Sequence, residues 1–176
     1  MSATLEEVRA WDAADPLRAF RQRFALPPGV IYLDGNSLGP PPVATAGRLA
    51  AAVEREWGAG LIGGWNDADW IGAPARVGGK IAGLIGAAPH EVIVADSTSV
   101  NIFKLLAAAL AARPGRGVIL TETGNFPTDL YVARGVADFV AGATVRAVAG
   151  ADLLDAIDGQ VAVVLLTHVH YKSAAR

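Results

Sequence analysis

The sequence predicts an α/β fold, with a mostly parallel sheet flanked by helices, on three observations. Short apolar runs alternate with segments of helical periodicity through the second half of the chain. The last run, residues 161–166, is apolar on both faces, as in strands that are buried on both sides of a sheet. Hydrophobic residues make up 52% of the 176 residues and charged residues 18%, which is enough apolar material for a core. Strands alternating with helices in this way are typical of a parallel sheet covered on both faces.

We expect residues 1–79 to form N-terminal helices and an arm rich in Gly and Trp. The first thirty residues have helical spacing that stops at Pro27-Pro28-Gly29, and a second helix is expected over 43–57. Between these helices, block 34–42 is so dense in Gly, Asn and Pro that we expect irregular backbone there.

Residues 58–79 contain seven glycines, and three of the four tryptophans lie within residues 57–79. Tryptophan rings close to so many glycines favour a loop that is packed by its own side chains. An ordinary surface loop is the alternative interpretation, although loops of this length are usually functional or disordered.

We expect residues 80–176 to be the first part of the α/β domain. Its expected strands are 91–96, 118–121, 144–148 and 161–166, and its expected helices are 80–86, 97–112, 128–136 and 151–157. The chain ends ten residues after the last expected strand, which is too short for the crossover helix that a parallel strand needs. We therefore expect a sheet that is incomplete at its carboxyl end, in the front part of a larger fold.

Charge and cysteine content exclude several classes of function. The chain has 15 basic and 17 acidic side chains, well interspersed, so no basic stripe is present and nucleic-acid binding is not expected. The absence of cysteine excludes disulfides, thiolate metal sites and cysteine nucleophiles, and it fits a reducing compartment.

The N-terminal sequence and the apolar runs predict a cytoplasmic protein that has no membrane partner. Glu6, Glu7 and Asp12 stand where a signal peptide would carry positive charge followed by an apolar run. The longest apolar runs, 105–112 and 161–166, are too short to span a bilayer.

Polar clusters follow three of the four expected strands, at the carboxyl ends where open parallel sheets bind ligands. The first cluster, residues 96–101, opens a helix with Ser97, Thr98 and Ser99. Backbone N–H groups and the dipole at a helix start attract phosphate, and hydroxyls would add hydrogen bonds. The alternative is that these residues only cap the helix.

The second cluster places Phe126 three residues before Asp129, with Pro127 fitting the first helical position. An aromatic face could stack on a flat heterocycle, and a carboxylate could hold a ring nitrogen protonated. The alternative is a buried phenylalanine beside an aspartate that complements the helix dipole.

The third cluster, residues 167–171, contains His168 and His170. A metal site is not expected, because the third histidine, His90, precedes a strand and no cysteine is available. The sequence also lacks a Gly-x-Gly-x-x-Gly or Walker motif after a strand and a Gly-x-Ser-x-Gly elbow, so the usual nucleotide and hydrolase-triad sites are excluded.

Taken in order, five blocks of the sequence resemble kynureninase across nearly the whole chain. They are Tyr32-Leu33-Asp34-Gly35-Asn36-Ser37-Leu38-Gly39, Trp57-Gly58, Ser97-Thr98-Ser99-Val100-Asn101, Asn125-Phe126-Pro127-Thr128-Asp129 and Thr167-His168-Val169-His170-Tyr171. The resemblance implies the amino-terminal part of the large domain of a fold type I pyridoxal-phosphate enzyme that acts as a homodimer. That family hydrolyses the Cβ–Cγ bond of kynurenine or 3-hydroxykynurenine, giving an anthranilate and L-alanine, in tryptophan catabolism and NAD biosynthesis.

The resemblance also implies a role for nine residues of this chain. Thr98 and Ser99 would bind the phosphate of pyridoxal 5′-phosphate, Phe126 would stack on its ring, Pro127 and Thr128 would shape the wall, Asp129 would lie near the ring nitrogen, Thr167 would reach the cofactor region, and Asn36 and Ser37 would lie near the substrate entrance. An electron-poor pyridine ring stabilises a carbanion, which is the chemistry that this bond cleavage needs.

A Schiff-base lysine is the group that the chain does not supply. Its lysines are Lys80, Lys104 and Lys172, and none stands at the position that the family uses, which lies later in the sequence. We therefore expect no catalytic residue in this chain and no hydrolysis by it alone. The sequence also carries Ala174 where the family usually has glycine.

Two other functions stay open at this point. The chain could belong to another enzyme of the same fold, similar to cysteine desulfurases or aminotransferases. It could also be a non-catalytic remnant that binds cofactor or forms dimers.

Overall fold

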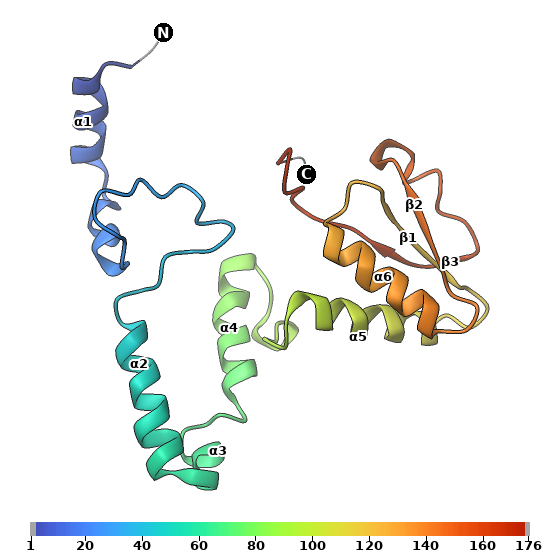
Figure 1. Ribbon diagram of the computed structural model, residues 1–176, viewed down its shortest axis with the longest axis horizontal. Coiled ribbons are helices and arrows are strands. Elements are labelled where there is room, and N and C mark those ends of the chain that lie inside the picture. The colour runs from blue at the N-terminus through green and yellow to red at the C-terminus, as the bar shows by residue number, and fades with distance from the viewer. Residues whose placement is uncertain (1–2, 175–176) are drawn as a thin grey trace. The chain divides into compact units, whose positions relative to one another are not determined.

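The computed structural model describes residues 3–174, which form two compact units that divide between Arg76 and Val77 (Figure 1). The expected domain boundary between residues 79 and 80 stays a prediction.

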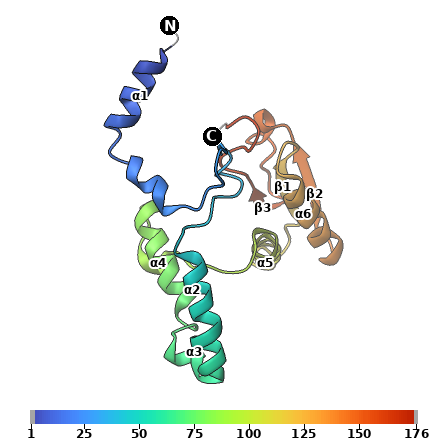
Figure 2. The same cartoon turned by 60° about the vertical axis from the view of Figure 1, so that its left-hand side comes forward.

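The first unit is helical. Its elements are α1 (Leu5–Ala14), η1 (Arg18–Arg23), α2 (Thr45–Ala51), η2 (Ala52–Ala59), η3 (Leu61–Gly63) and α3 (Gly64–Asp67). A capping box begins α1, because the Thr4 hydroxyl accepts from the Glu7 N–H while the Glu7 carboxylate accepts from the Thr4 N–H. Helix α2 continues without a break into the π-helical η2, and the two are drawn as one rod in Figure 2. As expected, residues 34–42 contain no helix and form turns.

The Gly/Trp-rich segment is mostly helical, so the expectation of a loop over 58–79 is wrong. It contains η3 and α3, and α4 (Ala73–Ile85) begins inside it. The tryptophans do pack locally, as predicted. Trp70 Nε1 donates to the Glu56 carboxylate at 2.8 Å, and its ring meets Trp65 edge to face.

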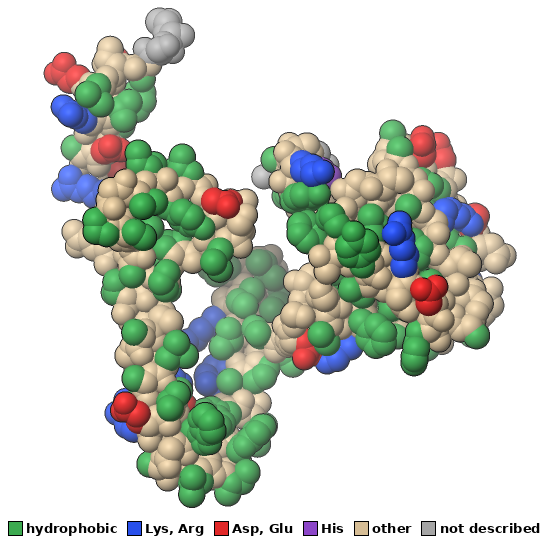
Figure 3. Space-filling view, viewed as in Figure 1, with side chains coloured by type: hydrophobic (Ala, Val, Ile, Leu, Met, Phe, Trp, Pro, Cys, Tyr) green, Lys and Arg blue, Asp and Glu red, His purple; other side chains and the backbone are tan. Residues whose placement is uncertain are grey.

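Many hydrophobic side chains of the first unit are exposed. Figure 3 shows them gathered on the surface around α3, where Leu61, Ile62, Trp65 and Ile71 are exposed. Among the described residues up to Arg76, no hydrophobic side chain is buried in a core.

The expected strand over 91–96 is wrong. After α4 and a short turn η4 (Pro89–Glu91), the chain is extended, but it pairs with no strand among the described residues. Ile93 is 70% exposed, whereas a paired central strand would bury it. This segment instead crosses α4 closely, with the Val92 carbonyl lying against Gly78.

The second unit contains a three-stranded parallel sheet, which confirms the predicted fold class. Its strands are β1 (Val118–Glu122), β2 (Thr144–Val148) and β3 (Val161–Leu165), in the order β2-β1-β3. The sequence predicted all three. The central β1 is buried on both faces, as its apolar run indicates.

The pairing between β1 and β3 contains a β-bulge. Val118 faces Val161, but Ile119 faces Val163, so β3 has one extra residue at this point. Val161 therefore packs on one face of the sheet, while Ala162 and Val163 pack on the other.

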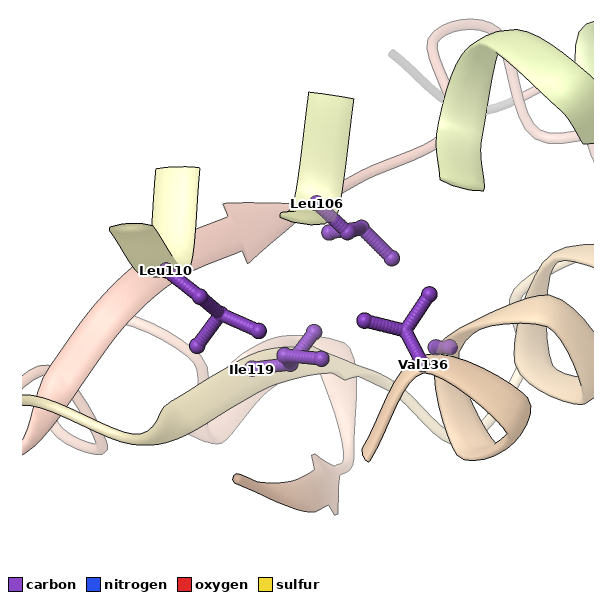
Figure 4. Close-up of a cluster of buried hydrophobic side chains, with 5 residues drawn as sticks. Leu106, Leu110, Ile119 and Val136 are labelled. Carbon is purple, nitrogen blue, oxygen red and sulfur yellow. The ribbon is translucent and has the colours of Figure 1, made fainter. Parts of the chain in front are cut away.

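Helices α5 (Thr98–Ala111) and α6 (Pro127–Phe139) cover one face of the sheet, close to the expected bounds of 97–112 and 128–136. Leu106 and Leu110 of α5 and Val136 of α6 point toward Ile119 of β1 (Figure 4). Burying several such side chains from three elements fixes both helices on the sheet.

The opposite face is covered by less structure. A short turn η5 (Gly150–Asp152) stands where a helix over 151–157 was expected, followed by turns. Leu153 is buried there against Leu120 and Val161. None of the helices formed by residues 3–174 is long and apolar enough to cross a membrane.

Candidate functional site

The N-terminus of α6 lies at the carboxyl edge of the sheet. Helix α6 begins just after the carboxyl end of β1, and the chain leaves β3 at this same edge. The predicted clusters 121–129 and 167–171 therefore lie side by side. Cluster 96–101, at the start of α5, is not brought to them, because Ser99 and Val100 share a groove with residues in the middle and at the end of α6.

A buried polar network joins two of these clusters. Asn125, only 4% exposed, donates from Nδ2 to the Thr121 hydroxyl at 3.0 Å. Its Oδ1 accepts from the Phe126 N–H at 2.7 Å and from the Thr167 hydroxyl. The Thr121 hydroxyl in turn donates to the Leu165 carbonyl at 2.9 Å. Buried polar groups that are all hydrogen-bonded hold a local structure firmly.

Phe126 presents an accessible ring beside this network. It is the N-cap residue of α6 and is 43% exposed. The Tyr171 ring meets it edge to face, with 5.0 Å between the ring centroids. His170 fixes the segment that carries Tyr171, because its Nε2 lies 3.1 Å from the Gly124 carbonyl and its Nδ1 accepts from the Lys172 and Ser173 N–H groups.

Asp129 lies one helical turn after Phe126. Its N–H donates to the Phe126 carbonyl at 3.0 Å, so both residues belong to the first turn of α6. Partial burial raises the pKa of the Asp129 carboxyl above its ordinary value. A cationic group beside this carboxyl would offset that cost, and a protonated pyridine nitrogen is such a group.

Thr98 and Ser99 lie in the first turn of α5, where Ser97 is the N-cap and accepts from the Val100 N–H. Ser99 lines an apolar groove of about 390 Å³ between α5 and α6, together with Val100, Phe103, Val132, Gly135 and Phe139. None of the described interactions joins these two hydroxyl residues to Phe126 or Asp129, so their role toward a phosphate stays a prediction.

Pro127 and Thr128 complete the first turn of α6. Pro127 also lines an open cavity of about 290 Å³, with Thr123, Tyr131, Arg134 and Lys172 around it. Thr128 is exposed on the same turn. That both residues shape the wall of a cofactor site stays a prediction.

Asn36 and Ser37 belong to the first unit and lie in a turn. The Ser37 and Leu38 N–H groups donate to the Asp34 carbonyl, and the Tyr32 hydroxyl donates to the Leu38 carbonyl at 2.6 Å. The role of both residues near a substrate stays a prediction.

The three lysines are engaged elsewhere or lie outside the first turn of α6. Lys104 forms an ion pair with Asp96, Lys80 lies in α4, and the Lys172 ammonium lies 5.3 Å from the centre of the Tyr171 ring.

Sequence reasoning did not assign Thr121 or Asn125 as site residues. Asn125 stood within the quoted Asn-Phe-Pro-Thr-Asp block, but its partners lie 4 and 42 residues away. The one feature of the sequence that could have indicated Asn125 is its place as a polar residue between an expected strand and an expected helix.

Comparisons with curated proteins find close relatives. The chain is 53% identical to a kynureninase from Pseudomonas fluorescens, 50% to one from Burkholderia pseudomallei (strain K96243) and 49% to one from Burkholderia mallei (strain SAVP1). Each alignment covers 97% of this chain and 42% of the relative, so the chain spans less than half the length of these proteins. No protein-family model matches the chain.

Proposed function

We propose that the chain forms the amino-terminal part of a kynureninase, because it is 53% and 50% identical to two kynureninases over 97% of its length. The complete enzyme would hydrolyse L-kynurenine or 3-hydroxykynurenine to the corresponding anthranilate and L-alanine. The observation that carries the proposal is the first turn of α6, where an accessible ring and a partly buried carboxyl stand side by side at the carboxyl edge of a parallel sheet.

Pyridoxal 5′-phosphate is the cofactor that we propose for this edge. When bound, it supplies an electron-poor ring that stabilises a carbanion. In this chain Phe126 would stack on the ring, and Pro127 and Thr128 would form the wall beside it. The Asp129 carboxylate would accept a hydrogen bond from the protonated ring nitrogen and so keep that proton in place.

The phosphate would lie at the start of α5. Thr98 and Ser99 supply hydroxyls there, and the N-terminus of a 14-residue helix attracts an anion. The chain's contribution would thus be to bind and orient the cofactor. Bond cleavage would also need a Schiff-base lysine. Lys172 lines the same cavity as Pro127, but it does not stand at the position of that lysine, which the resemblance implies lies later in the sequence.

We also propose that the complete protein is a cytoplasmic homodimer with a small-molecule substrate. The absence of cysteine fits a reducing compartment, and the many exposed hydrophobic side chains leave surface for further packing.

A binding titration tests the proposed ring site. Pyridoxine 5′-phosphate is the better probe, because it keeps the ring and phosphate but has an alcohol in place of the aldehyde, so surface lysines cannot capture it covalently. We expect Phe126→Ala and Asp129→Ala each to weaken its binding about tenfold, the effect of losing one stacking or charge-assisted contact.

A matched control comes from the other end of α6. Asp138→Ala removes a carboxylate from an exposed position of this helix and should leave the affinity unchanged. If neither Phe126→Ala nor Asp129→Ala weakens binding, the proposed pocket is wrong.

An activity assay tests the predicted inactivity of the chain alone. The purified chain, incubated with kynurenine and pyridoxal 5′-phosphate, should release no more anthranilate than the free cofactor does. Turnover above that level would contradict the view that the lysine lies elsewhere.

A further inference from the structure

We propose that Asn125 is a positioning residue that holds the first turn of α6, and with it Phe126 and Asp129, in place on the sheet. Its importance for cofactor binding rests on the proposed function, but its role in fixing the turn stands on geometry alone. Asn125 ties together three elements, because its partners come from β1, from the first residue of the turn and from the segment after β3.

The Leu165 carbonyl, at one end of the network, fixes the direction of every hydrogen bond in it. The Leu165 carbonyl only accepts, so the Thr121 hydroxyl must donate to it at 2.9 Å. The Thr121 oxygen then accepts from Asn125 Nδ2, which places Oδ1 toward the Phe126 N–H and the Thr167 hydroxyl. The Thr167 proton is therefore committed to Asn125, and Thr167 acts through Asn125.

An amide side chain is the group that satisfies every partner. The site needs a donor toward Thr121 and an acceptor for Phe126 and Thr167, and asparagine carries both. Aspartate would keep the acceptor but lose the donor, and alanine would leave buried hydrogen-bonding groups without partners, which is costly at 4% exposure.

Asn125 restrains Phe126 directly, and it restrains Asp129 through Phe126. Asn125 fixes the Phe126 N–H, and the Phe126 carbonyl accepts from the Asp129 and Leu130 N–H groups. The N-cap side chain makes no hydrogen bond of its own, since a phenylalanine stands there. Asn125 thus accepts from the N-cap N–H, as the N3 side chain of a capping box does.

Amide hydrogen exchange on the 176-residue chain tests this assignment without any ligand. In Asn125→Ala and Thr167→Val, we expect exchange at the Phe126 and Asp129 N–H groups to become about tenfold faster relative to Ile119 in the core, the effect of one lost hydrogen bond. Thr167→Ser keeps the hydroxyl and should restore slow exchange. The control Val136→Ala destabilises the same helix from the core and should speed exchange throughout the unit by a similar factor.

Binding of pyridoxine 5′-phosphate separates this inference from the proposed function. We expect Asn125→Ala and Thr167→Val to bind it about tenfold more weakly, and Thr167→Ser and Val136→Ala to bind it as the unaltered chain does. If the unaltered chain does not bind the probe, the proposed function fails while the exchange experiment still decides the role of Asn125. Should Thr167→Val exchange like the unaltered chain at Phe126, or Val136→Ala lose affinity as strongly as Asn125→Ala, the positioning role is overturned.

Discussion

Two features of the environment of the Asp129 carboxyl act on its charge in opposite directions: the helix N-terminus favours the charged form, and partial burial disfavours it. It lies in the first turn of α6, at the helix end where an anion is favoured, and its partial burial raises its pKa. A group kept in this condition on an accessible turn is a reasonable candidate for binding a cation.

The pH dependence of stability tests this description. Between the ordinary pKa of 3.8 and the raised one, the folded chain holds more protons on Asp129 than the unfolded chain does. The contribution of Asp129 to the free energy of unfolding therefore falls as the pH rises through this window. We expect the unfolding free energy of Asp129→Asn, relative to the unaltered chain, to increase from about pH 3 to about pH 7 in urea titrations.

The matched substitution for this experiment is Asp138→Asn, which removes an exposed carboxyl from the same helix. Its difference from the unaltered chain should change less with pH. A relative stability of Asp129→Asn that is flat or falls over this range would show that burial does not govern the carboxyl.

The residue types alone did not decide the candidate site. For Phe126 and Asp129 they allowed both ring binding and a purely structural role, and the resemblance of the surrounding block supplied the proposed roles. Asn125 could not be proposed, since its function depends on Thr167, which is 42 residues away and meets it only after three strands have paired. Ala174 adopts a φ of 56°, a conformation that favours glycine, which is the residue that the resemblance leads one to expect at this position.

At the scale of elements, α5 buries only the side chains on the face that packs against the sheet. Leu105 and Leu106 are neighbours in this helix, but Leu105 is 68% exposed and Leu106 only 2% exposed. We expect Leu106→Ala to lower the free energy of unfolding by about 2–5 kcal/mol, because it leaves a cavity against β1. Leu105→Ala should change it by less than about 0.5 kcal/mol, as measured by urea unfolding followed by circular dichroism.

Two glycines of α4 provide a second comparison within one helix. A Cβ on Gly78 would lie far inside van der Waals contact with the Val92 carbonyl, whereas a Cβ on Gly83 would meet only open space. Gly78→Ala should therefore destabilise the chain by about 1–3 kcal/mol, as overpacking does. Gly83→Ala should stabilise it by up to about 1 kcal/mol through helix propensity. A melting temperature that falls for Gly78→Ala and rises for Gly83→Ala would confirm the close crossing.

The same crossing explains one wrong prediction. Segments 91–96 and 144–148 are both short and apolar enough to be strands. Residues 144–148 form β2 because β1 is beside them, while residues 91–96 find no neighbouring strand among the described residues and lie against α4. Strand hydrogen bonds are made between segments, so an apolar pattern alone does not decide whether a strand forms.

At the scale of the whole molecule, the two units differ in how much they bury. Among residues 3–174, the side chains buried in hydrophobic clusters all come after Val77. Few buried apolar contacts imply easier local opening. We expect brief trypsin treatment to cut first at arginines of the first unit, such as Arg9, Arg23 and Arg55, before Arg134 or Arg146, with fragments identified by mass spectrometry.

Urea-denatured chain is the reference for this experiment, because there the order of cleavage reflects only the local sequence around each arginine. Early cleavage at Arg134 or Arg146 in the folded chain would contradict the difference between the units.

The one-residue bulge near the start of β3 sets which way the far end of that strand faces. Side chains alternate along a strand, so an inserted residue reverses every later one. Because Ala162 is accommodated beside Val118, Leu165 comes to stand opposite Thr121, and Thr167, two residues further on, reaches the side of the sheet on which Asn125 lies. The same sequence paired without the bulge would put Val164 opposite Thr121 and would turn Thr167 toward the other face. Deleting Ala162, in contrast, would restore regular pairing with Val163 still opposite Ile119, so Thr167 would keep its present side. The orientation of Thr167 toward Asn125 therefore depends on how one extra residue is accommodated at the far end of the strand.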